Sequence, residues 1–247
     1  MNMSQSQLLS ALLASVTVEE IERCVSEFED TNQSTVGWRP FGGRLNNRGT
    51  IEAASDAGRS IIERLTNGID ALLEREHALH SNQRPCNSPK EAAQAWFGVP
   101  SDGLQALDSG KRRALSQGIT VTLMQGESKA SRTIEVRDKG VGVEPERLAG
   151  TILSLNESNK IQKRYLAGAY GQGGSSTYAF CKYALVVSRT PNSDVCFAVV
   201  RYDDPPPEDP KEGRYVYLTD ADDIMRSSLP LDEFPAGTLV RHFGRGS

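Results

Sequence analysis

The chain has 247 residues, a net charge of −4 and a sequence pI of about 5.5. This length suits one large domain or two small ones. The acidic balance gives no electrostatic case for a domain that grips duplex DNA, although a local basic patch would escape such a count. No apolar run approaches the roughly 18 residues that a membrane span requires, and the first ten residues lack the basic start of a signal peptide.

The four cysteines are far apart in the sequence and form no C-x-x-C pair: Cys24, Cys86, Cys181 and Cys196. This arrangement disfavours a disulfide framework and fits a reducing compartment. His77, His80 and Cys86 lack the second ligand pair that would complete a metal site. We therefore expect a cytoplasmic protein that does not contact a membrane.

The first 54 residues are predicted to form two helices and an arm. Leucines at positions 8, 9, 12 and 13 have helical spacing, and Thr17-Val18-Glu19-Glu20 has the form of a capping box that opens a second helix. Residues 37–49 are rich in glycine and asparagine and are predicted to be a loop. We expect residues 1–54 to pack with residues 55–247 as one compact unit.

A long helix is predicted from about Asp56 to His80. Within it, Glu63, Asn67 and Asp70 are spaced i, i+4, i+7 and therefore lie along one side. The apolar residues form a separate, broadly opposite face: Ile62, Leu65, Ile69, Leu72 and Leu73. A solvated helix face has the same pattern, so the helix alone does not indicate a site.

Strands dominate the second half of the chain. The pattern predicts short helices at 90–97, 111–116, 145–155 and 175–181, and strands at 119–123, 132–138, 183–189, 195–202, 214–219 and 237–243. No internal repeat and no clear linker interrupts this order. One α+β domain is therefore the expected fold class.

The predicted strand at 132–138 carries a carboxylate on its apolar face. Ile134, Val136 and Asp138 alternate with polar residues and share one face. A carboxylate that points toward a core requires a hydrogen-bond donor, because an unpaired buried charge is costly. Alternatively, Asp138 ends the strand and caps the turn that follows.

A glycine-rich turn precedes the helix predicted at 175–181. Unsatisfied backbone N–H groups and the helix dipole make such a turn an anion site. Residues 171–176 lack the G-K-[ST] ending of a P-loop. An ordinary turn has the same composition, so this motif alone leaves both interpretations open.

Three motifs occur together: E-x-x-x-N-x-x-D-A at 63–71, D-x-G-x-G at 138–142 and G-x-Y-G-x-G at 168–173. In this order they resemble the GHKL ATPases, a superfamily of gyrase-type topoisomerases, large heat-shock chaperones, histidine kinases, MutL-type and MORC proteins. Gly237-Thr238 is similar to the family's threonine on a late strand. The resemblance covers about residues 55–243 and implies a two-layer sandwich, a mixed, mostly antiparallel sheet with helices on one face.

The resemblance assigns a role to each matching residue. Asn67 is expected to bind Mg²⁺ that bridges the phosphates, and Glu63 to activate the attacking water as general base. Asp70 would support the nucleotide side of the pocket, while Asp138, with Thr238, would recognise the adenine amino group. Further nucleotide contacts are expected from the turns and from a mobile lid: Gly140, Gly142, Ser158, Asn159, Lys160, Gly168, Tyr170, Gly171, Gln172, Gly173, Gly174 and Ser175.

The resemblance implies an Mg²⁺-dependent ATPase whose lid closes on ATP and drives homodimerisation or rearrangement of a downstream domain or effector subunit. A DNA-processing or defence system is the setting by analogy only. Slow turnover is expected, because the second domain that gives the family its γ-phosphate lysine has no counterpart in this sequence. A non-hydrolysing ATP sensor is the alternative. Glu63 argues against the third option, a histidine-kinase-like phosphotransferase.

Overall fold

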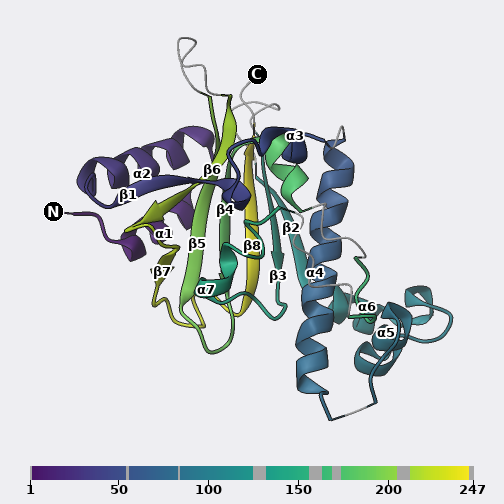
Figure 1. The fold of residues 1–247 in the computed structure, drawn as a ribbon. Coiled ribbons are helices and arrows are strands. Elements are labelled where there is room, and N and C mark those ends of the chain that lie inside the picture. Colours follow the sequence, from purple (N-terminus) through teal and green to yellow (C-terminus); the bar gives the residue numbers. More distant parts are fainter. Residues whose placement is uncertain are drawn as a thin grey trace.

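The computed structural model describes residues 2–53, 56–82, 84–124, 132–155, 163–168, 174–204 and 212–244. Within these ranges the chain forms one eight-stranded sheet (Figure 1). The strands are β1 (Val36–Pro40), β2 (Ile119–Met124), β3 (Thr133–Asp138), β4 (Cys181–Arg189), β5 (Val195–Asp203), β6 (Arg214–Asp220), β7 (Met225–Ser227) and β8 (Gly237–Gly244). Their order is β1-β6-β5-β4-β8-β3-β2, with β7 paired to β5.

Helices and 3-10 turns surround this sheet. The described α-helices are α1 (Gln5–Ala14), α2 (Val18–Thr31), α3 (Arg48–Ile51), α4 (Ala57–Leu79), α5 (Pro89–Phe97), α6 (Ser109–Ser116) and α7 (Pro145–Leu148). The 3-10 turns named here are η1 (Phe41–Gly43), η2 (Leu104–Ala106) and η4 (Ser175–Phe180). None of the helices in the described ranges is long and apolar enough to cross a membrane.

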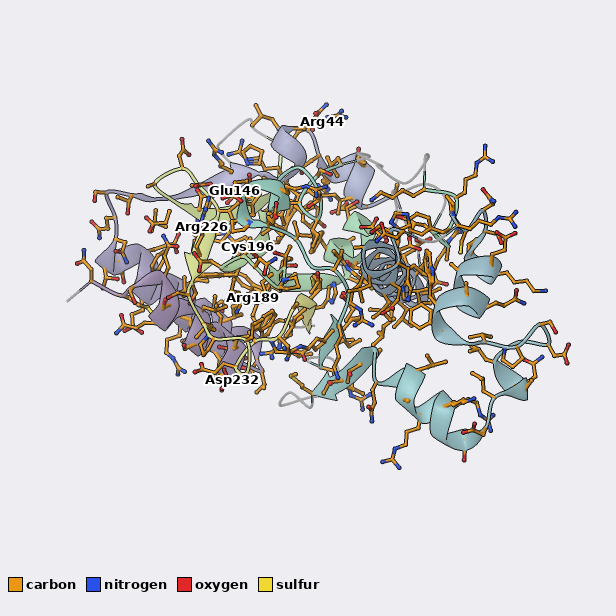
Figure 2. All side chains as sticks on the ribbon, turned by 90° about the horizontal axis from the view of Figure 1, so that it is seen from below. Arg44, Glu146, Arg189, Cys196, Arg226 and Asp232 are labelled. Atoms are coloured by element: carbon orange, nitrogen blue, oxygen red, sulfur yellow. The ribbon has the colours of Figure 1, made fainter. Side chains whose placement is uncertain are left out.

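The α+β class is confirmed, but the expected layering is wrong. Each strand pairing in the described ranges is antiparallel, so this sheet is not mixed. Helices α1 and α2 cover one face, whereas α3, α7 and η4 pack on the other. In the view from below, the N-terminal helices and labelled Arg44 lie on opposite sides of the strands (Figure 2). Helices on both faces make three layers.

The central strands explain how both faces are covered. Successive side chains of a strand point to opposite faces. In β4, Leu185 and Val187 therefore pack toward α1 and α2, while Ala184 and Val186 join the core beneath α7 and η4. A strand buried on both sides is apolar throughout, which is why the strand predicted at 183–189 has no alternating pattern.

The N-terminal helices are fixed to the sheet by a cap and a buried arginine. The predicted capping box is confirmed, because Thr17 Oγ1 accepts from the Glu20 backbone N at 3.2 Å and the Glu20 carboxylate accepts from the Thr17 N at 3.1 Å. Arg241 of β8 pairs with Glu135 at 2.6 Å and donates to the carbonyl oxygen of Ser15 at the end of α1. Charge-assisted hydrogen bonds therefore hold α1 to the sheet, in addition to the apolar packing of α1 and α2.

Helix α4 begins where the sequence predicts, with Asp56 as its cap. The orientation of its faces is less expected. Ile62 and Ile69 are 62% and 44% exposed, whereas Arg64 and Asp70 are only 7% and 3% exposed. The polar side of α4 thus faces the protein at these positions, and the solvated-face interpretation of the stripe is wrong for Asp70.

Two strands are missing from the sequence prediction, and one predicted turn is not described. Strand β1 lies within the predicted loop and pairs with β6, with Trp38 opposite Leu218. The Trp38 indole N donates to Glu29 of α2 at 2.6 Å. Strand β7 is only three residues long. The sequence also predicts a turn at 126–131, between the strands predicted at 119–123 and 132–138, and these residues lie outside the described ranges.

The short helix α5 packs against the C-terminal part of α4 through rings. His77 stacks on Tyr165 with centroids 4.5 Å apart, and Trp96 contacts both rings edge-on. His77 is therefore part of an aromatic cluster. This cluster places residues 163–168, which lead into the glycine motif, beside α4.

Candidate functional site

A cavity of about 390 Å³ lies between α4, strands β3 and β8, the loop after β3 and η4. It brings together seven of the residues singled out from the sequence: Asn67, Asp70, Asp138, Gly142, Gly174, Ser175 and Thr238. Three others lie outside its lining: Glu63, Gly140 and Gly168. The remaining seven lie outside the described residues: Ser158, Asn159, Lys160, Tyr170, Gly171, Gln172 and Gly173.

Asp138, the last residue of β3, forms the polar floor at the sheet end of the cavity. Its side chain shares a face with buried Val136, as the alternation predicts. The Oδ1 atom accepts from the Gly140 N at 2.8 Å and the Thr238 N at 3.3 Å. Burial raises the pKa of this carboxyl to about 6, although these hydrogen bonds oppose the rise. Both hydrogen bonds from the described residues reach Oδ1, which leaves Oδ2 as the acceptor for a ligand.

A serine that the sequence analysis missed orients Thr238. Ser188 Oγ accepts from the Val143 N at 2.9 Å and donates to the Gly237 carbonyl at 3.1 Å. Because a hydroxyl has one proton, the 2.9 Å contact between Ser188 and Thr238 is a bond that Thr238 donates. Thr238 lines the cavity and, with its proton donated to Ser188, keeps its hydroxyl oxygen as an acceptor. The signal in the sequence is a serine directly after the apolar run 183–187 of β4.

Two glycines let the loop after β3 approach its neighbours. A Cβ at Gly140 would lie 2.4 Å from the Cβ of Ala71, and the next residue, Val141, donates its N–H to the Ala71 carbonyl at 3.0 Å. Gly142 has φ +69°, and a Cβ there would lie 1.8 Å from the carbonyl oxygen of Arg189. Larger residues at either position would push the loop away from α4 and β4.

At the helix end, Asp70 holds the beginning of the glycine motif. Its carboxylate accepts from the Ala167 N at 2.7 Å and from the Gly168 N at 3.2 Å. One turn further along α4, Glu74 pairs with Lys163 at 2.7 Å. Asp70 therefore has two roles: it lines the cavity, and its carboxylate holds the backbone of Ala167 and Gly168, which lead into the motif.

The end of the same motif is fixed to α4 by a second group of bonds. The hydroxyls of Ser60 and Ser176 are 3.0 Å apart. Arg64 donates from Nε and Nη2 to the Thr177 hydroxyl at 3.1 and 2.9 Å, and Thr177 donates to the Gly174 carbonyl at 3.0 Å. Both flanks of residues 169–173 are thus bonded to one helix. Arg64 was not singled out from the sequence, although it lies three residues before Asn67 and so near its side of the helix.

Asn67 and Glu63 differ in their position relative to the cavity. Asn67 lines it, and a Cβ at Gly174 would lie 3.0 Å from the Asn67 amide nitrogen. Glu63 is half-buried one turn earlier, and within the described ranges its carboxylate has neither a hydrogen bond nor an ion pair. No described residue therefore competes for this carboxylate as an acceptor, but Glu63 stands beside the cavity and not in its wall.

The described residues contain no group of three His, Cys, Asp or Glu side chains that could hold a metal ion. A divalent cation at Asn67 would therefore take most of its ligands from phosphate oxygens and water. Mg²⁺ is commonly bound in this way, through few protein ligands together with substrate phosphates.

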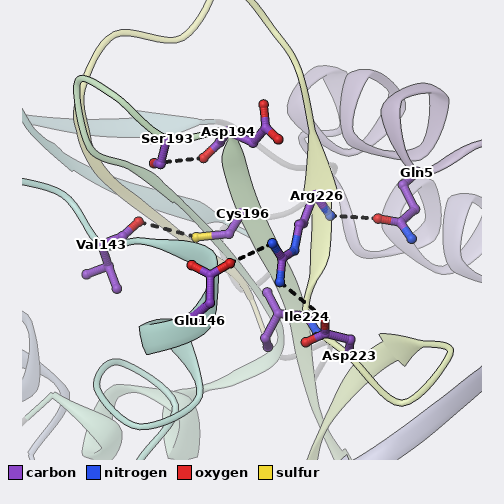
Figure 3. Close-up of polar contacts among 9 residues, drawn as sticks. All are labelled: Gln5, Val143, Glu146, Ser193, Asp194, Cys196, Asp223, Ile224 and Arg226. Atoms are coloured by element: carbon purple, nitrogen blue, oxygen red, sulfur yellow. Dashed lines mark hydrogen bonds and ion pairs between the residues drawn. The ribbon is translucent and has the colours of Figure 1, made fainter.

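Cys196, near the loop after β3, has no nucleophilic character. Its thiol donates to the carbonyl oxygens of Val143 at 3.5 Å and Ser188 at 3.2 Å (Figure 3). Burial raises its pKa to about 12, so the reactive thiolate is scarcely populated at neutral pH. The thiol is a packing group that joins β5 to the cavity loop.

Arg226 of β7 connects α7, which follows the loop after β3, to the N-terminal helix α1. Its guanidinium donates to Glu146 of α7 at 2.7 Å and to Asp223 at 3.2 Å, and its backbone N donates to Gln5 of α1 at 2.6 Å (Figure 3). The loop that borders the cavity is thus connected to the helices on the opposite face of the sheet.

Comparison with known proteins gives no relative: no family model matches the chain, and no curated protein matches it. Function is therefore inferred from the site itself.

Proposed function

We propose that the cavity binds ATP and that the chain is a slow, Mg²⁺-dependent ATPase of the GHKL type. The observation that carries this proposal is the polarity of one cavity: a buried carboxylate lies at the sheet end, and a glycine-flanked stripe of α4 lies at the helix end. A volume of about 390 Å³ falls within the range of small-molecule sites, roughly 300–1,000 Å³.

The sheet end suits the adenine base. Oδ2 of Asp138 would accept a hydrogen from the 6-amino group, and Thr238 would accept or relay a second bond through its lone pairs. Guanine carries a 6-oxo group at the same place, and this oxygen would face the carboxylate. A site with an unpaired buried acceptor rejects such a ligand strongly, so the proposal includes a preference for ATP over GTP.

The helix end suits the phosphates. Gly174 and Ser175 at the start of η4 line the cavity, and Asn67 lies against the same glycine. Asn67 would hold Mg²⁺ together with phosphate oxygens, and the ion would neutralise their charge and polarise the terminal phosphoryl group. The expected contacts from Ser158, Asn159, Lys160 and 170–173 remain predictions outside the described residues.

Hydrolysis is assigned to Glu63 as general base. Its carboxylate has no hydrogen bond or ion pair to the part of the chain that the structure describes, and Glu63 lies one turn before Asn67 on α4. Lid closure that drives homodimerisation, or rearrangement of a downstream domain or effector subunit, belongs to the proposal by resemblance, as does a cytoplasmic DNA-processing or defence setting.

Calorimetric titration of the chain with ATP, GTP and adenosine in Mg²⁺ buffer tests the binding claim. We expect ATP and adenosine to bind, and GTP to bind at least about tenfold more weakly than ATP. Equal affinity for ATP and GTP would contradict the assignment of Asp138 to the base. The matched control is Asp194→Asn, which neutralises an exposed aspartate and should change none of the affinities.

A non-hydrolysing ATP sensor is the second candidate, and the position of Glu63 outside the cavity lining favours it. Single-turnover measurement of phosphate release from ATP separates the two. An ATPase releases one phosphate per bound nucleotide, whereas a sensor releases none. Transfer of label from [γ-³²P]ATP to the protein would instead indicate a phosphotransferase.

A further inference from the structure

Arg64 is a buried arginine that faces the cavity without an acidic partner. Its exposed fraction is 7%, and no carboxylate of the described residues forms an ion pair with it. Arginine is rarely this buried unless it is paired. Removing its charge from water is costly, and a well-placed anion with good hydrogen-bond geometry offsets this cost.

The guanidinium is held in one orientation. Nε and Nη2 both donate to the Thr177 hydroxyl, whose own proton is donated to Gly174. The guanidinium carbon also lies 5.0 Å from the centre of the Tyr178 ring. These contacts fix two of the three nitrogens on neutral groups and leave Nη1 without a bond to the described chain.

Nη1 lies where the helix end of the cavity meets the glycine motif. A Cβ at Gly174 would be 3.6 Å from Nη1 of Arg64 and 3.0 Å from the amide nitrogen of Asn67. Arg64 and Asn67 therefore border the same space beside Gly174, three residues apart on one helix. A phosphate group in this space would meet both side chains and the N–H groups of η4.

The groups beneath Arg64 do not neutralise it. His242 is neutral, because burial and the nearby Arg64 charge lower its pKa to about 3. Burial likewise raises the pKa of the Tyr178 hydroxyl, so this group carries no charge either. His242 and Tyr178 therefore leave the positive charge of Arg64 uncompensated on their side of the cavity.

We propose that Arg64 binds the terminal phosphate groups of a nucleoside triphosphate through Nη1. This inference rests on the proposed nucleotide function and adds a cation supplied by the same helix that carries Asn67. A phosphate is a strong charge-assisted acceptor for a guanidinium, and a pre-oriented arginine loses little conformational freedom on binding it. The contact distinguishes ATP from adenosine, since adenosine has no group that reaches this end.

The experiment compares binding of ATP and adenosine to Arg64→Met by calorimetry in Mg²⁺ buffer. Methionine keeps the apolar stem and removes the charge. We expect the affinity for ATP to fall at least about tenfold, as for other lost hydrogen bonds to charged groups, while the affinity for adenosine stays within about twofold. Arg147→Met is the matched control, because Arg147 lines the same cavity but is exposed; its effect on ATP should be smaller.

A measurement on the unmodified chain covers the case in which Arg64→Met does not fold. Phenylglyoxal modification of Arg64 is followed by peptide mass spectrometry with ATP, inorganic triphosphate or adenosine present. ATP and triphosphate should slow the modification, and adenosine should not. Equal protection by all three, or protection by none, would overturn the phosphate assignment.

The failure of this inference can be separated from failure of the proposed function. If the unmodified chain binds ATP and Arg64→Met weakens ATP and adenosine by the same factor, or neither, Arg64 has only a packing role. If the unmodified chain binds neither ligand, the nucleotide function itself is wrong and the assignment of Arg64 falls with it.

Discussion

The two ends of the cavity are built in different ways. At the sheet end, Asp138, Ser188 and Thr238 stand on three neighbouring strands. They bond to one another's strands and to the backbone of the loop after β3. At the helix end, one helix holds both flanks of the glycine motif through the side chains of Asp70 and Arg64. The sheet therefore determines the shape of the cavity at one end, and a few side-chain hydrogen bonds from α4 determine it at the other.

The ends also differ in electrostatics. The sheet end contains a carboxyl whose ionisation burial disfavours, with its pKa raised to about 6. The helix end contains the buried cation of Arg64 over neutral groups, beside the carboxylate of Asp70, which accepts from the backbone N–H groups of Ala167 and Gly168. A ligand with a hydrogen-bond donor at one end and negative charge at the other would complement both ends of the cavity. Substitutions at either end should weaken this complementarity.

The largest effect is expected for chemistry at the helix end. Glu63→Ala should lower single-turnover phosphate release by about 10²–10⁴-fold, because a general base contributes on that order. ATP affinity should stay within about twofold, since Glu63 does not line the cavity. Quenched-flow phosphate release and calorimetry measure the two quantities, with Glu233→Ala at an exposed site as the control. Undiminished release from Glu63→Ala would remove this residue from the mechanism.

Asp138→Asn should break the sheet end while making the empty protein more stable. The amide keeps an acceptor for the Gly140 and Thr238 N–H groups but presents a donor or a neutral oxygen to the adenine amino group. We expect adenosine and ATP to bind about 10–100-fold more weakly, as for a lost bond to a charged group. Calorimetry checks this loss.

The stability gain of the same variant depends on pH. The folded chain holds a proton on Asp138 up to about pH 6, whereas an aspartate in the unfolded chain loses it near 3.8. Stability from this group is therefore lost as pH rises from about 4 to about 6, by about 3 kcal/mol at most. Urea unfolding should show Asp138→Asn to be more stable than the unmodified chain at pH 8, with the difference disappearing near pH 3.5.

Asp70→Asn should weaken the helix end selectively. The amide accepts only one of the two backbone bonds well, and each lost bond to a charged acceptor contributes about 1.5–3 kcal/mol. We expect ATP affinity to fall about tenfold, faster hydrogen exchange at residues 163–168, and unchanged adenosine affinity. Loss of adenosine binding in this variant would show that the two ends are not independent.

Acid should weaken the sheet end alone. Protonated Asp138 no longer offers a full carboxylate to the base, so adenosine affinity should fall as pH drops through about 6, by about tenfold at pH 5. Adenosine is the suitable probe, because it lacks phosphates that titrate in this range. A flat profile between pH 8 and 5 would contradict the contact with Asp138.

The smallest effect is expected away from both ends. Arg226→Gln removes the ion pairs to Glu146 and Asp223, which are largely exposed. Exposed ion pairs contribute about 0–1 kcal/mol, so the free energy of unfolding should change by no more than this and adenosine affinity should not change. A larger loss of adenosine affinity would mean that the ion pairs of Arg226 position the loop after β3.

Local patterns in the sequence predicted the parts of this structure that depend on near neighbours. The capping box at Thr17, the extent of α4 and the inward face of Asp138 all follow from spacings of a few residues. The motif order also singled out seven residues that line one cavity, although no comparison with known proteins supports the family itself.

The remaining features depend on contacts between distant segments. Strand β1 exists because Val36–Pro40 pairs with β6 some 180 residues later, which no local pattern reveals. Arg64 stands in the sequence like any charged residue of an exposed helix face, and only the packing of α4 against η4 shows that it faces the cavity. Helices α1 and α2 are amphipathic whichever face of the sheet they cover, so their periodicity could not predict three layers.

The most direct test is a crystal structure of the chain with Mg²⁺ and a non-hydrolysable ATP analogue. We expect the adenine amino group within hydrogen-bond distance of Asp138 Oδ2, and the phosphates beside Gly174, in contact with Asn67 and Arg64. A nucleotide bound outside the cavity, or bound with its phosphates at Asp138, would contradict this expectation.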